Sequence, residues 1–343
     1  MTRAAAVWLE RPPAAWNELL RDDPNATPAH RPELWHALAG VRPGLAARFV
    51  AVRSGDTLLG GAAAIIERRG PFHWIHALPM GLPGAPLARA GRHEEVDRAV
   101  ALALDQLRCE LRALGGSWSL YRPRGPAVAP AALAGLPGET TRLESAVIDL
   151  GAGLAAAWRR IDRKARQEIT RARAQLRAEE DPGSLETAYA LYAAQSRGWA
   201  AHTSMPLELS RRLLARAGDA PPAARLFTVR DARGPLSAAF ALDHAREVLV
   251  WWSGTHPEGR SRQAFGLLLW SIVEWAAAAG RVRVNLGANP GLDAVAAFKR
   301  SLGAEPLAWP IRWLDARAAS LAGRALAGVQ RWRGRARARG APA

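Results

Sequence analysis

The sequence predicts an α/β protein in which one structural unit occurs twice. The unit is an antiparallel meander of three strands followed by a loop, a helix and a further strand. Two patterns carry the prediction. Segments of alternating apolar and polar residues are separated by short turns with glycine or proline, and a glycine-containing loop leads from each meander into an apolar helix. We therefore expect a mixed, largely antiparallel sheet flanked by helices in each half.

The C-terminal half shows the pattern more clearly than the N-terminal half. It predicts strands at 226–231, 236–242, 247–255, 281–287 and 307–314, and helices at 265–279 and 291–303. The N-terminal half predicts strands at 49–54, 57–67, 72–78 and 117–122, and a helix at 93–114. The repetition indicates duplication and predicts a degenerate N-terminal domain, 1–145, and a C-terminal domain, 146–314.

The C-terminal domain begins with a mostly helical insertion, 154–217. Its first predicted helix, 154–176, carries an apolar stripe: Trp158, Ile161, Ala165, Ile169, Ala172 and Leu176. Cations fill the other positions of this segment: Arg159, Arg160, Arg163, Lys164, Arg166, Arg171, Arg173 and Arg177. Further helices are predicted at 184–199 and 206–217, and residues 315–343 are expected to form a helix and an arginine-rich tail.

The composition is that of a folded protein with excess positive charge. Of 343 residues, 49% are hydrophobic and 23% are charged, which excludes a wholly disordered basic chain. Lys and Arg number 47 against 31 Asp and Glu, giving +16. Lys164 and Lys299 are the only lysines, and this rarity draws attention to both. The basic segment could be a solvated face, but its self-repulsion slightly favours an anionic partner: a nucleotide-linked or lipid-linked sugar, tRNA or an anionic membrane surface.

Several classes of site and location are not expected. The single cysteine, Cys109, excludes an internal disulfide framework and a paired-cysteine zinc site, and its helical spacing predicts a packed residue. The histidines lack ligand spacing, so we expect no metal. The N-terminus lacks a signal-peptide pattern, and no apolar run reaches the ~20 residues of a membrane span. We expect a cytoplasmic protein that could contact the inner face of the membrane peripherally.

Acid–base candidates cluster in the C-terminal half. They are His244, Glu247, His256 and Glu274, and Glu274 could instead satisfy a buried polar group with Ser271 in the apolar helix.

Aromatic residues supply two further candidates for a substrate cleft. Trp251 and Trp252 are neighbours in a strand and face opposite ways, so one is expected in the core and the other could line a cleft. Tyr189 and Tyr192 share a helical face, which favours core packing over a groove.

Four segments resemble the Fem-like branch of the GNAT acyltransferases. They are IDRKARQEITRARAQL, YALYAAQSRGW, the run from VLVWWSGT to RVRVNLG, and AVAAFKRSLGA. The resemblance spans about 147–313, with a weaker match over the N-terminal half. This branch contains the aminoacyl-tRNA-dependent peptidoglycan aminoacyltransferases and a group linked to cellulose and exopolysaccharide biosynthesis, which the chain resembles more closely.

The resemblance implies tandem GNAT-like domains and direct acyl transfer to an amine, without a metal or a nucleophilic serine or cysteine. We expect an acyltransferase for groups other than aminoacyl, with acetyl-CoA or another acyl-CoA as donor. The acceptor would be an amino sugar or another anionic precursor of the cell envelope or exopolysaccharide. The alternatives are aminoacyl-tRNA-dependent transfer, with tRNA as partner, and a non-catalytic basic binding module of envelope assembly.

The resemblance and the residue patterns together give a set of candidate site residues. Lys299 matches the lysine after the family's terminal phenylalanine, and the 260–266 loop takes the place of a donor-phosphate loop, with incomplete glycine spacing. The predicted catalytic residues are Lys299, Glu274 and His256. The predicted donor-binding residues are Arg260, Arg262, Gln263 and Gly266. The predicted substrate-binding residues are Arg163, Lys164, Arg166, Trp251 and Tyr192.

Overall fold

The computed structural model describes residues 4–77, 82–124, 128–197, 204–215, 221–288 and 293–314. The chain divides into two compact units. Of the described residues, those within 4–19, 44–142 and 310–314 form the first unit, and those within 20–43 and 143–309 form the second. The predicted C-terminal helix and arginine-rich tail, 315–343, lie outside the described residues. The two units are discontinuous in sequence, with residues 20–43 grouped with 143–309, so the expected domains 1–145 and 146–314 stay a prediction.

The first unit is a sheet with one long helix on its buried face. Its strands are β1 (Ala5–Leu9), β2 (Leu45–Ser54), β3 (Thr57–Arg69), β4 (Phe72–Ala77), β5 (Leu87–Ala88) and β6 (Gly115–Ser119). Strands β1 to β4 pair antiparallel in chain order, and β4 pairs parallel with β6. Helix α3 (His93–Glu110) supplies Val96, Val100 and Leu104 to the core. A short 3-10 helix, Pro130–Leu133, follows.

Cys109 corrects one prediction. It was expected to pack, but it is exposed near the end of α3. The buried face of this helix is set by Val100, Leu104 and Leu107. At 100° per residue, Cys109 lies far round the helix from Leu104, so its side chain faces away from the sheet.

A polar cluster joins three neighbouring strands of the first unit. His76 on β4 contacts the Ser117 hydroxyl on β6 through Nδ1 at 2.9 Å, and its Nε2 lies 3.7 Å from Glu67 on β3. Burial alone would raise the pKa of Glu67, but hydrogen bonds from His76 and Arg69 overcome it and lower the pKa to about 2.

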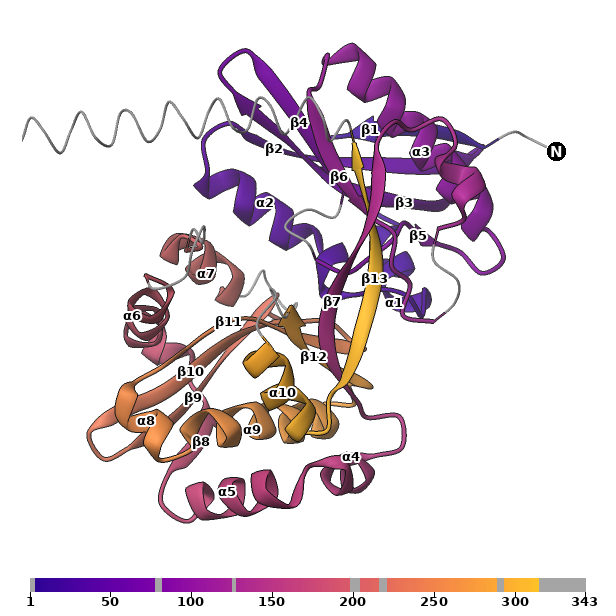
Figure 1. Ribbon diagram of the computed structural model, residues 1–343. Coiled ribbons are helices and arrows are strands. Elements are labelled where there is room, and N and C mark those ends of the chain that lie inside the picture. Colours follow the sequence, from indigo (N-terminus) through magenta and orange to yellow (C-terminus); the bar gives the residue numbers. More distant parts are fainter. Residues whose placement is uncertain are drawn as a thin grey trace, which may run out of the picture. The chain divides into compact units, whose positions relative to one another are not determined.

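The second unit is a sheet covered by helices on both faces. Its strands are β8 (Arg177–Glu180), β9 (Ala224–Asp231), β10 (Gly234–Asp243), β11 (Glu247–Thr255) and β12 (Arg283–Ala288). Its helices are α2 (Pro32–Val41), α4 (Leu154–Arg160), α5 (Arg163–Arg173), α6 (Leu185–Ser196), α7 (Leu207–Leu214), α8 (Pro257–Ser261), α9 (Ala264–Ala278) and α10 (Asp293–Ser301), with short 3-10 helices at Pro28–His30 and Pro182–Ser184. Figure 1 shows α6 and α7 on one side of the strands and α8, α9 and α5 on the other.

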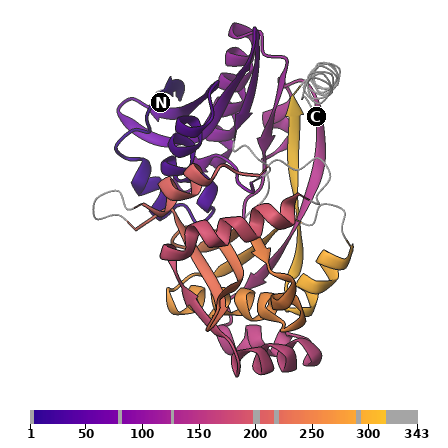
Figure 2. The same cartoon turned by 90° about the vertical axis from the view of Figure 1, so that its left-hand side faces the viewer.

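Three elements have residues in both units: α1 (Trp16–Asp22), β7 (Glu139–Asp149) and β13 (Glu305–Leu314). Within the second unit, β7 pairs antiparallel with β12, and within the first, β13 pairs antiparallel with β6. Figure 2 shows the structure turned by 90°, with β13 in yellow. The tandem GNAT-like α/β architecture, with a mixed and mostly antiparallel sheet, is confirmed.

The basic segment forms two helices instead of the predicted single helix. Helix α4 ends at Arg160, Ile161 is extended, and α5 begins at Arg163. The backbone N–H of Asp162 donates to Ser301 O (2.9 Å), a long-range bond that replaces an intrahelical one. The predicted apolar stripe survives the break, because Ile161, Ala165 and Ile169 are buried with α9 in one core.

Candidate functional site

The β11 and β12 strands form a parallel pair that opens after three residues. Glu247 pairs with Arg283, Val248 with Val284 and Leu249 with Asn285. Strand β11 continues to Thr255, but its residues 250–255 have no strand partner on the β12 side among the described residues. Backbone amides along such an edge can pair with an extended ligand.

A β-bulge lies on β11 where the strands separate. Phe240 of β10 pairs with Trp252, and the next residue, Ala241, pairs with Val250, so Trp251 is the extra residue. Trp252 is buried and stacks on Phe240, with ring centroids 5.1 Å apart. Trp251 is half-buried, and its place in a substrate cleft stays a prediction. The bulge reorients the peptide groups beside Trp251 relative to a regular ladder.

Asn285 provides a physical reason for the opening. Its side-chain oxygen accepts from the Ser145 hydroxyl at 2.5 Å and from the backbone N–H of Gly287 at 2.9 Å. Gly287 adopts φ +80°, a conformation that strongly favours glycine. Because Asn285 captures the N–H two residues on, β12 turns instead of continuing its ladder beside β11.

Lys299 holds the end of β12 from the neighbouring helix α10. Its Nζ donates to Gly287 O at 2.8 Å and to Ala288 O at 3.0 Å. The side chain is buried, and this burial lowers its pKa to about 8. An ammonium has three N–H donors, and within the described ranges no acceptor or carboxylate is found for the third. The helical pattern around Lys299 is typical of a surface lysine, so the rarity of lysine in the sequence was the better indicator of a special role for this residue.

The N-terminus of α9 presents free backbone donors. Gln263 precedes the helix with φ +58°, and the first i to i−4 bond runs from Leu267 N to Gln263 O. The N–H groups of the first turn therefore lack intrahelical acceptors and attract an anion. Gly266 is buried in this turn, and a Cβ there would contact Ile169 of α5 at an ordinary 3.8 Å.

The two arginines of the preceding loop have different surroundings. Arg262 is bound to Asp231 at 2.5 Å and to Glu258 at 3.4 Å, which fixes the loop to β9. Arg260 is exposed and has no ion-pair partner among the residues that the structure describes. Of the four predicted donor-binding residues, Gln263, Gly266 and Arg260 thus lie at the free helix end, and Arg262 is held by carboxylates.

The two predicted acid–base residues lie in different settings. His256 is exposed before α8, and its Nδ1 accepts from Glu258 N at 3.3 Å. Glu274 accepts from Arg173 at 2.7 and 2.8 Å and from Trp270 Nε1 at 2.8 Å. The expected partner of Glu274, Ser271, donates to Leu268 O instead. Glu274 thus links α9 to α5, and a catalytic role for either residue stays a prediction.

The other two acid–base candidates are buried. Burial lowers the pKa of His244 to about 4. Glu247 is buried on β11 and binds Arg283 at 2.7 Å, and burial raises its pKa despite that partner. The Glu247 carboxyl also accepts from the Asn285 side-chain amide at 3.4 Å. Its contacts with Arg283 and Asn285 link the paired end of β11 to β12.

The predicted substrate-binding residues do not form one cluster. Tyr192 is 1% exposed and stacks on Trp252 with centroids 5.0 Å apart, as the packing alternative expects. Arg163 and Lys164 are exposed on α5, and Arg166 is half-buried there. No hydrogen bond or ion pair between described residues joins these three cations to the strand opening, so their role as acceptor ligands stays a prediction.

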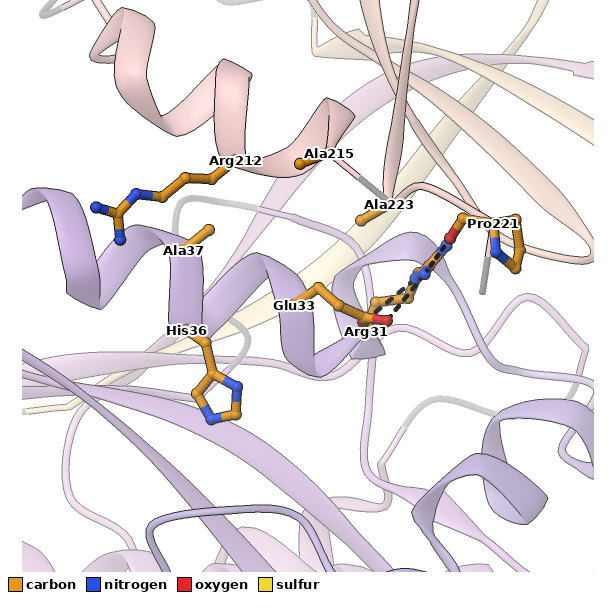
Figure 3. Close-up of a pocket in the computed structure, with 8 residues that line it drawn as sticks. All are labelled: Arg31, Glu33, His36, Ala37, Arg212, Ala215, Pro221 and Ala223. Carbon is orange, nitrogen blue, oxygen red and sulfur yellow. Dashed lines mark hydrogen bonds and ion pairs between the residues drawn. The ribbon is translucent and has the colours of Figure 1, made fainter. Parts of the chain in front are cut away.

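A separate cavity of about 280 Å³ lies in the second unit between α2, α7 and the start of β9. Figure 3 shows that Arg31 in its wall is already bound to Glu33 and to the carbonyl of Pro221. None of the predicted site residues lines this cavity. The strand opening with the α9 N-terminus and Lys299 is therefore the better candidate site.

The candidate site lies within a recognisable domain. Residues 155–300 match the family model described as Acetyltransferase (GNAT) domain. Among solved structures, FemX is 12% identical with a TM-score of 0.71, covering 92% of this chain and 99% of that chain. L-PGS from Bacillus licheniformis is 15% identical with a TM-score of 0.54, covering 95% and 98%. A tandem GNAT protein from the clavulanic acid biosynthesis pathway is 16% identical with a TM-score of 0.52, covering 91% and 98%.

These likenesses establish the GNAT acyltransferase fold. No curated protein matches the chain in sequence. Within the part of the chain that the structure describes, every helix is too short or too polar to span a bilayer.

Proposed function

We propose that the second unit transfers an acyl group from an acyl-CoA thioester to an amine. The observation that carries the proposal is the β11–β12 opening, which has a bulge at Trp251 and a free helix end at Gln263 within a GNAT domain. A donor with amides along an extended arm and phosphates at its end suits an unpaired strand edge that leads toward a helix N-terminus.

The residues present fit such a donor. The unpaired edge of β11 offers peptide groups to the pantetheine amides, and the first turn of α9 offers N–H groups to the phosphates. Arg260, which has no acidic partner in the described part of the chain, adds a cation beside that turn. Arg262 is neutralised by Asp231 and Glu258 and supports the loop.

The chemistry needs no covalent enzyme intermediate. The neutral acceptor amine forms a bond to the acyl carbon, the carbon–sulfur bond breaks, and the proton lost by the amine ends on the thiolate or in solvent. The negative charge that develops on the acyl oxygen needs a donor in place beforehand. We assign this role to the peptide N–H groups at the Trp251 bulge. Lys299, whose Nζ donates to Gly287 O and Ala288 O at the end of β12, is assigned as a charged donor beside them.

We further propose an amino sugar or another envelope or exopolysaccharide precursor as acceptor, as the resemblance to that Fem-like group implies. The predicted cytoplasmic location belongs to the same proposal, because acyl-CoA is a cytoplasmic donor. The second candidate is aminoacyl-tRNA-dependent transfer, which the resemblance to the peptidoglycan branch implies.

Ligand binding and turnover test the proposal together. We expect CoA and acetyl-CoA to raise the thermal midpoint, with about 2.7 kcal/mol of stabilisation at 100 times Kd. Acetyl-CoA should release free thiol only when a suitable amine is present, in a panel of amino sugars and amino acids. Arg260→Glu should weaken CoA binding about tenfold, whereas Arg42→Glu, at the exposed arginine that follows α2, should not.

Each alternative gives a different result. Stabilisation by aminoacyl-tRNA, without a response to CoA, would move the donor to the second candidate. A lack of response to both donors would contradict acyl transfer and favour a non-catalytic binding module.

A further inference from the structure

Helix α5 has one face fixed against the protein and one face exposed. Ala165, Ile169 and Ala172 are buried with α9. A single guanidinium nitrogen of Arg173, Nη2, donates to both carboxylate oxygens of Glu274 on α9. These contacts hold α5 along the outside of the helix layer, where Figure 1 shows it farther from the strands than α9.

The exposed face of α5 is cationic, and most of its cations lack a carboxylate partner among the described residues. It consists of the exposed Arg163, Lys164, Gln167, Thr170 and Arg171 and the half-buried Arg166. Among the described residues, Arg163, Arg166 and Arg171 have no acidic partner. Lys164 has only Glu168, at 3.9 Å, while 89% of its own side chain is exposed. Four cations along a helix about 16 Å long repel one another, so the arrangement does not stabilise the fold.

The chemistry of this face favours a lipid headgroup layer over RNA. Binding of single-stranded RNA uses aromatic side chains that stack on bases, and the six residues of this face include none. Nor does the face border the described cavity, which lies at α2 and α7. A convex row of arginine and lysine side chains instead matches a broad, laterally mobile layer of negative charge.

We propose that the exposed face of α5 docks the protein on a bilayer that carries anionic headgroups. The proposal concerns a surface distinct from the β11–β12 opening, and it holds whether or not the donor is acyl-CoA. The interaction is electrostatic, because the face has no exposed apolar side chain to insert. Binding should therefore weaken steeply as the salt concentration rises.

Vesicle co-sedimentation of the full chain tests this inference. We expect binding to vesicles of phosphatidylglycerol and phosphatidylcholine and none to phosphatidylcholine alone. Each cation near an anionic surface strengthens binding about fivefold. The triple variant Arg163→Gln, Lys164→Gln, Arg171→Gln should then bind on the order of 100-fold more weakly. The control Arg11→Gln, Arg42→Gln, Arg197→Gln removes the same charge from exposed positions elsewhere and should keep most of the binding.

A second variant separates surface charge from a shaped pocket. Replacing Arg163, Arg166 and Arg171 by lysine keeps the charge but removes the planar guanidinium groups, so vesicle binding should persist. Circular dichroism and thermal midpoints establish that each variant is folded. Equal losses in the triple variant and its control would overturn the proposal. So would binding of unacylated tRNA through this face without binding to anionic vesicles.

Discussion

Among the described residues, no carboxylate pairs with the buried ammonium of Lys299, so removal of this side chain should stabilise the protein at neutral pH. Burial lowers its pKa from 10.5 to about 8, and the difference corresponds to about 3 kcal/mol of destabilisation while the lysine is charged. Lys299→Met removes that penalty and two hydrogen bonds, which contribute about 1 kcal/mol each. We expect the variant to be about 1 kcal/mol more stable at pH 7 and to lose acyl transfer.

The pH dependence gives this prediction its sign. Between pH 8 and 10.5 the unfolded chain binds the Lys299 proton more tightly than the folded protein, so the stability of the parent protein rises through this window. The variant lacks this rise. Above pH 10.5 the penalty has vanished in the parent, and the variant should be about 2 kcal/mol less stable because only the lost hydrogen bonds remain.

Urea unfolding of both proteins from pH 6 to 11 measures the difference, and titrations common to both cancel. Arg300→Met, at the exposed neighbouring position on α10, controls for loss of a cation and should show no crossover. A stability difference between Lys299→Met and the parent that is independent of pH would refute the reasoning.

Three further predictions concern other parts of the fold. The pKa of Glu67 is about 2 against an ordinary 4.5, so Glu67→Gln should lower the free energy of unfolding by up to about 3 kcal/mol above pH 4.5. This loss of stability should vanish as the pH falls to 2. Guanidinium unfolding curves at several pH values would show a loss independent of pH if the bonds of Glu67 to His76 and Arg69 were unimportant. Gly254→Ala should cost 3 kcal/mol or more in thermal unfolding, since a Cβ at this position collides with the backbone of α6, and a loss under 1 kcal/mol would mean that the helix shifts freely. Asn285→Leu should cost about 2 kcal/mol and lower the rate of acyl transfer at least tenfold in a thiol-release assay, and full activity would contradict its role in the strand opening.

Much of the sheet is predictable because its signals are local. Strand alternation and glycine turns gave β9, β10 and β11 within two residues at each end, and the apolar run gave α9 within one. The errors arise where a distant contact overrides a local pattern. The break at Ile161 depends on a bond to Ser301, far along the chain. Strand β7 was not predicted, nor was the grouping of residues 20–43 with the second unit, because the partners of both segments lie far away in sequence.

The candidate site divides in the same way. Lys299 and the 260–266 loop could be found from residue rarity and from the resemblance. The bulge at Trp251 depends on the register between β10 and β11, which no single strand encodes. Asn285 could have been noticed as an asparagine two residues before a glycine in the RVRVNLG strand, although its partner Ser145 is 140 positions away.

Hydrogen–deuterium exchange with and without acetyl-CoA tests the central claim most directly, because it reports where a donor lies on the chain. The account predicts that acetyl-CoA slows exchange in residues 250–255 of β11 and in residues 263–267 at the start of α9. This protection should be smaller in Arg260→Glu and unchanged in Arg42→Glu. Protection confined to the first unit, or an unchanged exchange pattern at saturating acetyl-CoA, would contradict the assignment of the β11–β12 opening as the donor site.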